Sequence, residues 1–260
     1  MNKNFFILFF SAITLFFTFS LSANGNDEVR ELMRYKIRYG FLNGGEVEYR
    51  TQIEEYKDKP VYHTRVDAKT TGFIDQLYKL HDIYESYYDV QTGLPELAIQ
   101  NLSEGKYRHY DEVSFFQEQS YASSKKRETT FLLFEPTYDI LSAIEHLRGM
   151  NWDNFMNGDT ITIITAYDKD PFPIHVIYRG KETITIGDYK YKCHKFAPII
   201  DPGKILKKKE SILIWFSDDE NKIPVNIRLN LVVGAFKLEL EETPALLHPF
   251  TAKSHKKNKK

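Results

Sequence analysis

Cys193 and His194 are the adjacent pair in this sequence best suited to nucleophilic chemistry, because an imidazole beside a thiol can lower the pKa of the thiol. The residues around the pair predict a β-strand, in which adjacent side chains point to opposite faces. Cys193 then shares a face with Tyr191, whereas His194 shares the other face with Lys192. We therefore expect a buried, inert cysteine rather than a catalytic thiol.

The acidic run from Asp218 to Asn221 could bind a hard cation through its oxygens, but it lacks the spaced ligands and the glycine of an EF-hand loop. In hairpin turns Asp and Asn also bond to nearby backbone. The histidines are scattered singly, and phosphate loops, dinucleotide fingerprints and Gly-x-Ser-x-Gly elbows are absent. The sequence therefore predicts no metal, no cofactor and no catalytic residue, while convergence of reactive groups from distant strands stays open.

Aromatic residues make up 15% of the chain, and many of them are tyrosines in alternating segments. A tyrosine has an apolar ring and a polar hydroxyl, which suits the wall of a cavity for an amphiphile or a sugar. Ordinary sheet packing is the alternative for any one of them. With the apolar residues of one predicted helix, they give the candidate ligand-binding residues: Tyr35, Tyr39, Tyr49, Tyr84, Tyr88, Ile140, Ile144 and Leu147.

The elements that position these residues are mostly strands. Aromatic or β-branched residues alternate with charged residues from about residue 34 onwards, which indicates strands with one buried and one wet face. Short connections between them favour antiparallel pairing. After a first hairpin around 43–45, we expect strands at 61–69, 78–89, 97–102, 106–115, 120–127, 160–167, 172–178, 181–186, 189–196, 210–216, 224–232 and 235–242.

Two further hairpins share one pattern: an aromatic pair, an acidic polar loop, and an apolar residue followed by proline. They cover 87–95 (YYDVQTGLP) and 215–224 (WFSDDENKIP). A proline has no N–H to donate, and at the start of a strand this disturbs the hydrogen bonding between strands least. The predicted helices lie at different distances from the two hairpins, so we infer local recurrence rather than duplication of a half-domain.

Two segments are predicted to be helical. The stronger covers 137–148, with Thr137 as its cap and Gly149 as its terminator, and the weaker covers 72–77, where Phe73 and Leu77 are four residues apart. The stronger helix is expected either on the concave face of a curved sheet or at the end of a barrel. The predicted fold is mainly β: a curved antiparallel sheet forming a half-barrel or barrel, with one or two short helices packed against it.

The first 23 residues have the features of a secretory signal peptide, with Lys3 before an apolar run and small residues up to Ala23. A retained membrane anchor is the alternative. No cysteine lies near the end of the apolar run, so lipid attachment there is excluded, and Cys193 alone cannot form an intramolecular disulfide. We expect a soluble protein of the Gram-negative periplasm that is not a lipoprotein, with one β-rich domain over 24–250 and a basic, disordered tail over 251–260.

Several of these segments resemble an exported bacterial family that is defined only as a domain of unknown function. They are 178–183 (YRGKET), 193–196 (CHKF), 215–225 (WFSDDENKIPV), 39–47 (YGFLNGGEV) and the hairpin at 87–95, so the resemblance spans nearly all of the mature chain. It brings no catalytic residues. A looser similarity, through the acidic-turn hairpins, is to periplasmic half-barrels that carry lipoproteins or lipids and enclose an apolar cavity.

These features predict a soluble periplasmic binding or carrier protein for an amphiphilic ligand, namely a lipid, a lipoprotein acyl chain or a glycolipid. The alternatives are a non-catalytic structural or interaction protein of the cell envelope, with an envelope protein as partner, and an envelope hydrolase. The formal charge is −1 although the final residues are rich in lysine, so the body is acidic and no nucleic-acid partner is expected. The basic tail is a candidate for transient contact with a membrane surface.

Overall fold

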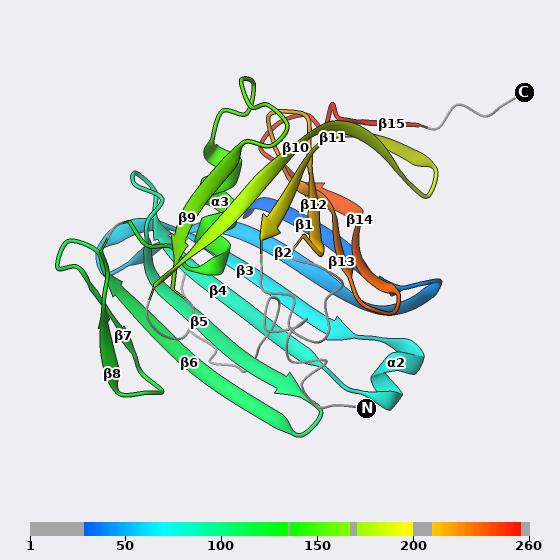
Figure 1. The fold of residues 1–260 in the computed structure, drawn as a ribbon. Helices are drawn as coiled ribbons and strands as arrows, with labels where there is room; N and C mark the ends of the chain where they lie inside the picture. The colour runs from blue at the N-terminus through cyan, green and yellow to red at the C-terminus, as the bar shows by residue number, and fades with distance from the viewer. Residues whose placement is uncertain (1–28, 135, 167–170, 200–209, 256–260) are drawn as a thin grey trace, which may run out of the picture.

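The computed structural model describes residues 29–134, 136–166, 171–199 and 210–255. Figure 1 shows one large, strongly curved sheet with α3 (Ile140–Gly149) on its concave side and α2 (Gly72–Leu77) at one end. The strands are β1 (Val29–Tyr39), β2 (Leu42–Tyr56), β3 (Lys59–Thr70), β4 (His81–Asp89), β5 (Pro95–Glu104), β6 (Tyr107–Phe116), β7 (Tyr121–Ser124), β8 (Thr129–Leu132), β9 (Thr160–Thr165), β10 (Phe172–Ile186), β11 (Tyr189–Ile199), β12 (Ile212–Ser217), β13 (Pro224–Asn230), β14 (Ala235–Ala245) and β15 (Lys253–His255).

All of the strand pairs are antiparallel, and the order across the sheet is β8-β7-β6-β5-β4-β3-β2-β1-β14-β13-β12-β11-β10-β9, with β15 beside β11. Apart from the β1–β14 pair, neighbours along this path are also neighbours in sequence, as short hairpin connections require. The predicted fold class is confirmed: the residues that the structure describes form one curved antiparallel sheet that does not close into a barrel, with two short helices.

The segment before α3 runs beside the edge strand β9. The backbone N–H of Tyr138 donates to Ile164 O at 2.9 Å, and that of Ala166 donates to Tyr138 O at 2.8 Å. The side chain of Gln117, in the turn between β6 and β7, donates to Thr137 O at 2.6 Å. This segment therefore connects the two halves of the sheet where strand pairing ends.

Three predicted strand boundaries are wrong. Residues 172–178 and 181–186 belong to one strand, β10, because a bulge between Tyr178 and Lys181, with Gly180 at a φ of +83°, changes the register without ending the strand. The predicted strand 120–127 is too long: β7 ends at Ser124, and a turn separates it from β8, which begins at Thr129 and was not predicted. Finally, β4 begins at His81, because Tyr78 still bonds to Ile74 O and completes α2.

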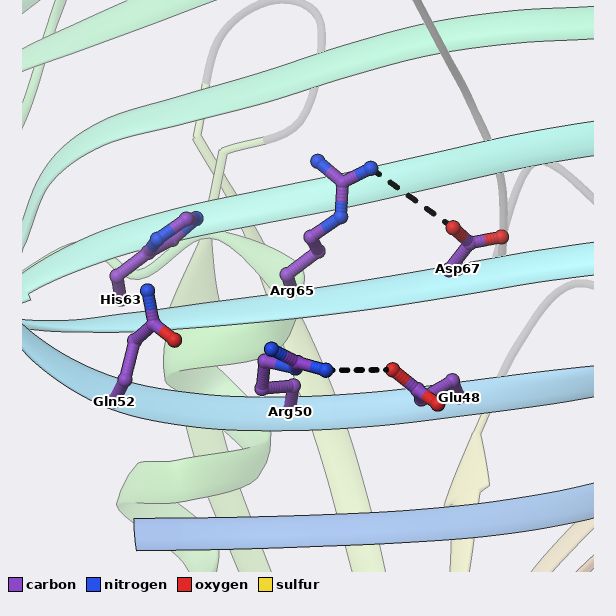
Figure 2. Close-up of a pocket in the computed structure, with 6 residues that line it drawn as sticks. All are labelled: Glu48, Arg50, Gln52, His63, Arg65 and Asp67. Atoms are coloured by element: carbon purple, nitrogen blue, oxygen red, sulfur yellow. Dashed lines mark hydrogen bonds and ion pairs between the residues drawn. The ribbon is translucent and has the colours of Figure 1, made fainter. Parts of the chain in front are cut away.

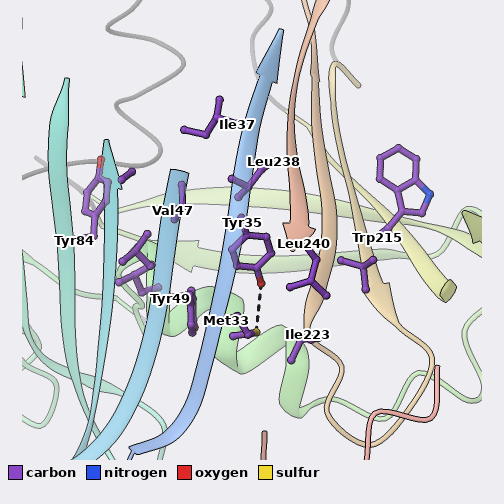
Figure 3. Close-up of a cluster of buried hydrophobic side chains, with 14 of the residues drawn as sticks. Met33, Tyr35, Ile37, Val47, Tyr49, Tyr84, Trp215, Ile223, Leu238 and Leu240 are labelled. Carbon is purple, nitrogen blue, oxygen red and sulfur yellow. Dashed lines mark hydrogen bonds between the residues drawn. The ribbon is translucent and has the colours of Figure 1, made fainter. Parts of the chain in front are cut away.

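The main hydrophobic cluster includes the inward side chains of β1, β2 and β14, which lie side by side on the concave face (Figure 3). Tyr35 and Met33 of β1 lie at its centre, and the Tyr35 hydroxyl donates to the sulfur of Met33 at 3.3 Å. A second cluster packs α3 against β10, β11 and β12 around Trp152. The Trp152 ring lies 4.9 Å from Phe196 and 5.5 Å from Phe216, centroid to centroid. Each fully buried ring stabilises the fold by roughly 1.5–3 kcal/mol.

The N-cap of α3 is Asp139 and not the predicted Thr137. One carboxylate oxygen of Asp139 accepts from the backbone N–H groups of Leu141 and Ser142, and the Ser142 hydroxyl accepts in return from the Asp139 N–H. This capping box satisfies N–H groups that a helix start leaves without partners. The Ser86 hydroxyl of β4 donates to Asp139 at 2.6 Å, so the helix lies on the concave face, one of the two expected places.

No helix in the described ranges is long and apolar enough to cross a membrane. The predicted signal peptide, 1–23, lies outside the described residues. Within the predicted tail, β15 pairs with β11, and the Lys253 ammonium lies 4.0 Å from the centre of the Tyr189 ring. Residues 256–260 lie outside the described part of the chain.

Candidate ligand-binding site

The two hairpins that share a sequence pattern meet at one end of the sheet, beside the last turn of α3. A cleft of about 460 Å³ opens between them, which we call the hairpin-end cleft. Gln91, Thr92 and Gly93 line it from the β4–β5 turn, and Glu220 and Asn221 line it from the β12–β13 turn. The recurrent pattern therefore marks a single place in the fold.

One carboxylate in each hairpin, Asp89 and Asp219, bonds within its own turn. Asp89 accepts from the backbone N–H groups of Gln91 at 3.0 Å and Thr92 at 2.8 Å. Asp219 accepts from the N–H of Asn221 at 3.2 Å. These are the local bonds by which Asp stabilises turns, as the sequence predicted. Within the described ranges, no group of three or more His, Cys, Asp or Glu side chains is placed to hold a metal ion.

The floor of the hairpin-end cleft is a buried ionic network around Arg148 of α3. Its Nη1 and Nη2 donate to the two oxygens of Glu31 at 2.9 and 2.7 Å, and Nη1 also donates to Glu145 at 2.7 Å. Nη2 donates to Asn221 O at 2.8 Å, and Nε donates to Lys222 O at 3.2 Å. All five N–H donors of the guanidinium therefore have acceptors. Burial alone lowers the pKa of Arg148, but the carboxylates raise that pKa well above its usual value.

One wall of the cleft is aromatic. The rings of Tyr62 and Tyr88 lie 5.3 Å apart, and the Arg30 guanidinium lies 5.1 Å from the centre of the Tyr62 ring. Burial, aided by the negative charge of Glu145, raises the pKa of Tyr88 well above its usual value. The hydroxyl therefore stays neutral and bonds to the Thr64 hydroxyl at 3.0 Å. The wall thus offers ring faces and a cation to a bound molecule.

The structure brings some of the predicted ligand-binding residues to this cleft and places the others elsewhere. Tyr88 lines the cleft, and the Tyr49 hydroxyl donates to Glu145 in its floor. Tyr35 and Tyr84 lie in the main cluster. In α3, Leu147 and Ile144 pack in or against the cluster around Trp152, and Ile140 is half-buried at the first turn. Tyr39 lies at the opposite end of the sheet, where its hydroxyl donates to Val233 O at 3.1 Å.

Sequence reasoning missed the charged floor and the apolar residues opposite the aromatic wall, Met150 and Leu247. A signal for the floor was present. Glu31 continues the inward series of Met33 and Tyr35 on β1, and a carboxylate on a buried face requires a cationic partner. No comparable signal identifies Met150 or Leu247, because they reach the cleft only through tertiary packing.

A second cleft, of about 400 Å³, lies beside the first and contains His194 and Asp218. His194 bonds through Nε2 to Asp218 at 2.9 Å and through Nδ1 to the Tyr178 hydroxyl at 3.0 Å. Burial lowers the pKa of His194 despite the adjacent carboxylate, which favours the neutral ring. Both ring nitrogens are engaged, so this histidine holds β10 and β11 to the β12–β13 turn and has no lone pair directed at a substrate.

Cys193 is buried on the opposite face of β11, with its sulfur 3.6 Å from Tyr191 O. Burial raises the pKa of the Cys193 thiol to about 12. The thiolate, which is the reactive form, is therefore scarce at neutral pH. The prediction that Cys193 is buried, on the face of β11 opposite His194, is confirmed.

A third pocket, of about 280 Å³, lies on the outer face of β2 and β3 and is formed by charged side chains (Figure 2). Arg50 pairs with Glu48 at 3.3 Å, and Arg65 pairs with Asp67 at 3.9 Å, as the dashed lines show. His63 closes one side of the pocket. Because these charges neutralise one another along each strand, the pocket is an outer-face ionic lattice and a poorer ligand site than the hairpin-end cleft.

The outer-face lattice gives a pH-dependent prediction for His63, which bonds to Glu54 at 2.9 Å and to Glu85 at 2.7 Å. Burial alone lowers the pKa of His63, but the two carboxylates produce a net rise. Because the folded pKa is the higher one, the stabilisation is complete below the unfolded value of about 6.5 and disappears as the pH rises through the folded pKa. We expect His63→Gln to destabilise the protein more at acidic than at alkaline pH, in urea unfolding at both. An equal loss of stability at both pH values would contradict the conclusion that the two carboxylates stabilise protonated His63.

Comparison with known proteins identifies relatives of unknown function. The model of a family described as protein of unknown function (DUF3108) matches residues 34–241. Among solved structures, the chain is similar to a β-barrel-like protein of domain of unknown function DUF1849 from Brucella abortus, with a TM-score of 0.54 and 11% identity over 83% of this chain and 97% of that chain. At this identity the likeness concerns the fold. No curated protein matches the sequence.

Proposed function

Because the chain belongs to DUF3108, a family of proteins of unknown function, we propose its function from the geometry of the cleft: it is an exported binding or carrier protein whose amphiphilic ligand occupies the hairpin-end cleft. The supporting observation is an open cleft of about 460 Å³ that combines apolar and polar walls above a fully bonded ionic floor. Ligand sites commonly combine an apolar lining with a few fixed polar groups.

The apolar part of the ligand would contact the rings of Tyr62 and Tyr88 and the side chains of Met150 and Leu247. The polar part would meet Arg30, whose guanidinium lies over the Tyr62 ring and has no carboxylate partner among the residues that the structure describes. An anionic headgroup suits this cation, because a guanidinium can donate two parallel hydrogen bonds to a carboxylate or a phosphate.

The ionic floor favours binding over catalysis. Every N–H donor of Arg148 is hydrogen-bonded within the protein, and Glu145 accepts hydrogen bonds from both Arg148 and the Tyr49 hydroxyl. Groups that are fixed in this way give a rigid base that does not need to reorganise when a ligand enters. The same saturation leaves none of them free to act as an acid or a base.

Gly149 allows a direct test of the cleft. It lies at the cleft as the last residue of α3, and a Cβ built there would have no atom within 4 Å. Gly149→Trp should therefore fill the cleft without distorting the fold. With monomeric lysophosphatidylglycerol as the probe, we expect the natural chain to bind one molecule and Gly149→Trp to bind at least about ten-fold more weakly, measured by calorimetry and native mass spectrometry.

Thr130→Trp is the matched control, because it adds the same side chain at an exposed position of β8. It should bind the probe as the natural chain does. Equal binding by Gly149→Trp with an unchanged unfolding midpoint, or no binding by the natural chain, would refute the proposed function.

A further inference from the structure

Exposed apolar side chains gather at the end of the sheet opposite the hairpin-end cleft, where Figure 1 shows α2 beside the β1–β2 and β13–β14 turns. Phe41, in the β1–β2 turn, is 90% exposed, and Val233, in the β13–β14 turn, is 74% exposed. We call this set the apolar rim; its members are Phe41, Leu42, Phe73, Leu77, Val232 and Val233.

The three segments of the rim are held side by side. The N–H of Thr71, just before α2, donates to Gly44 O in β2 at 3.2 Å. On the other side, the Tyr39 hydroxyl of β1 donates to Val233 O at 3.1 Å. The β1–β2 turn is therefore flanked by α2 and by the β13–β14 turn. The six exposed side chains therefore lie on three neighbouring segments, whereas exposed apolar residues on most soluble surfaces are scattered singly.

The orientation of α2 is the reverse of what burial would favour. Phe73 and Leu77 are four residues apart and so lie on one helix face, and both are largely exposed. No residue of α2 is buried. The apolar face of this helix is thus presented to the surroundings, which is the arrangement expected of a segment that partitions into another apolar phase.

The charges beside the rim identify that phase. Lys79 follows α2, and its carbonyl accepts from the N–H of Gly105 in the β5–β6 turn, at 2.8 Å, so Lys106 and Arg108 lie close by. All three cations are exposed, and none has a carboxylate partner within the described ranges. Two nearby carboxylates are already engaged: Glu46 pairs with Lys69 at 2.8 Å, and Asp75 accepts from Thr70 at 2.8 Å.

We propose that the apolar rim docks on an anionic lipid bilayer, with Phe41, Phe73 and Val233 in the acyl boundary and Lys79, Lys106 and Arg108 at the headgroups. Burial of apolar area and attraction of basic side chains to anionic lipid both strengthen such contacts. The eleven residues of β1 run from the hairpin-end cleft to the rim, so docking places the cleft at most about 35 Å from the membrane. This surface is separate from the basic tail and does not depend on occupancy of the cleft.

The test places a tryptophan in the rim. Phe41→Trp is compared with Phe134→Trp, which lies outside the rim at a position that is 82% exposed. The natural tryptophans, Trp152 and Trp215, are buried and contribute the same background to both variants. On vesicles of phosphatidylglycerol and brominated phosphatidylcholine, we expect strong quenching of Phe41→Trp and little quenching of Phe134→Trp. Equal quenching of the two would overturn the proposal, even if another segment binds the vesicles.

Charge reversal tests the headgroup contact. We expect Lys106→Glu with Arg108→Glu to weaken binding to anionic vesicles, measured by flotation, at least about thirty-fold, because each of the two basic residues contributes about 1 kcal/mol near the surface. Lys57→Glu, in the β2–β3 turn, combined with Lys59→Glu, at the first position of β3, should leave flotation unchanged, because both lie at the cleft end of the sheet. Equal losses in both pairs would overturn the proposal. If the natural chain is a dimer, and Phe41→Ser dissociates that dimer without changing vesicle binding, then the rim contacts a second copy of the chain and not a membrane.

Discussion

Replacing Arg148 by methionine is expected to lower the free energy of unfolding by about 3–5 kcal/mol, because removing one partner of a buried ion pair leaves the other charge uncompensated. Here two carboxylates are affected: Glu31 loses both of its bonds to the guanidinium, and Glu145 loses its ion pair. The carbonyls of Asn221 and Lys222 lose their donors as well. Urea unfolding monitored by circular dichroism measures this loss.

Two controls separate the buried network from charge in general. Arg34→Met removes a surface arginine that pairs with Glu48 and Glu242, and it should leave the unfolding midpoint nearly unchanged. Adding Glu31→Gln and Glu145→Gln to Arg148→Met removes the stranded charges and should restore much of the stability. If Arg148→Met lowers the free energy of unfolding no more than Arg34→Met does, the ionic floor does not hold α3 on the sheet.

Asp139→Ala is expected to lower the free energy of unfolding by about 2–3 kcal/mol, because it removes the cap of α3 together with a buried bond to β4. The lost bonds are those from the N–H groups of Leu141 and Ser142 and from the hydroxyls of Ser142 and Ser86. Arg148 would still hold the last turn. We therefore expect the first turn to fray, with faster amide exchange at Leu141 and Ser142 than in the last turn.

Asp139→Asn is the matched control for this cap. Asparagine caps helices as well as aspartate does, and its side-chain oxygen can accept from the same N–H groups. Burial raises the pKa of Asp139 despite its bonds to Ser142 and Ser86, so loss of the charge carries little penalty of its own. A loss of stability in Asp139→Asn as large as that in Asp139→Ala would show that the charge stabilises α3 and that the capping geometry does not.

The strand pattern predicts the fold well because alternation is a local property. Glu31, Met33, Tyr35 and Ile37 face inward on β1, and such a series is readable without knowledge of the partner strands. The errors arose where the chain bends. The bulge at Gly180 was read as a strand end, and the turn between β7 and β8 was read as strand, because turn geometry depends on the hydrogen bonds that neighbouring strands offer.

The site was predictable only in part. Tyr88 and Tyr49 were selected from their place in alternating segments, and both prove to lie in the wall or the floor of the cleft. The pairing of Arg148 with Glu31 was not predictable, because it joins residues 117 positions apart and depends on where α3 crosses the sheet. The shared hairpin pattern was interpreted only as local recurrence, because the sequence does not show that the two hairpins meet at one cleft.

Photo-crosslinking locates the bound amphiphile and so tests the central proposal most directly. A lysophosphatidylglycerol with a photoreactive acyl chain, added below its critical micelle concentration, is irradiated with the full chain and the labelled residues are identified by mass spectrometry. We predict labelling at Tyr62, Tyr88, Met150 and Leu247, which line the hairpin-end cleft, and loss of this labelling in Gly149→Trp. Labelling confined to the apolar rim or to the outer face of β2 and β3, or no labelling at all, would contradict the proposal that the cleft binds an amphiphile.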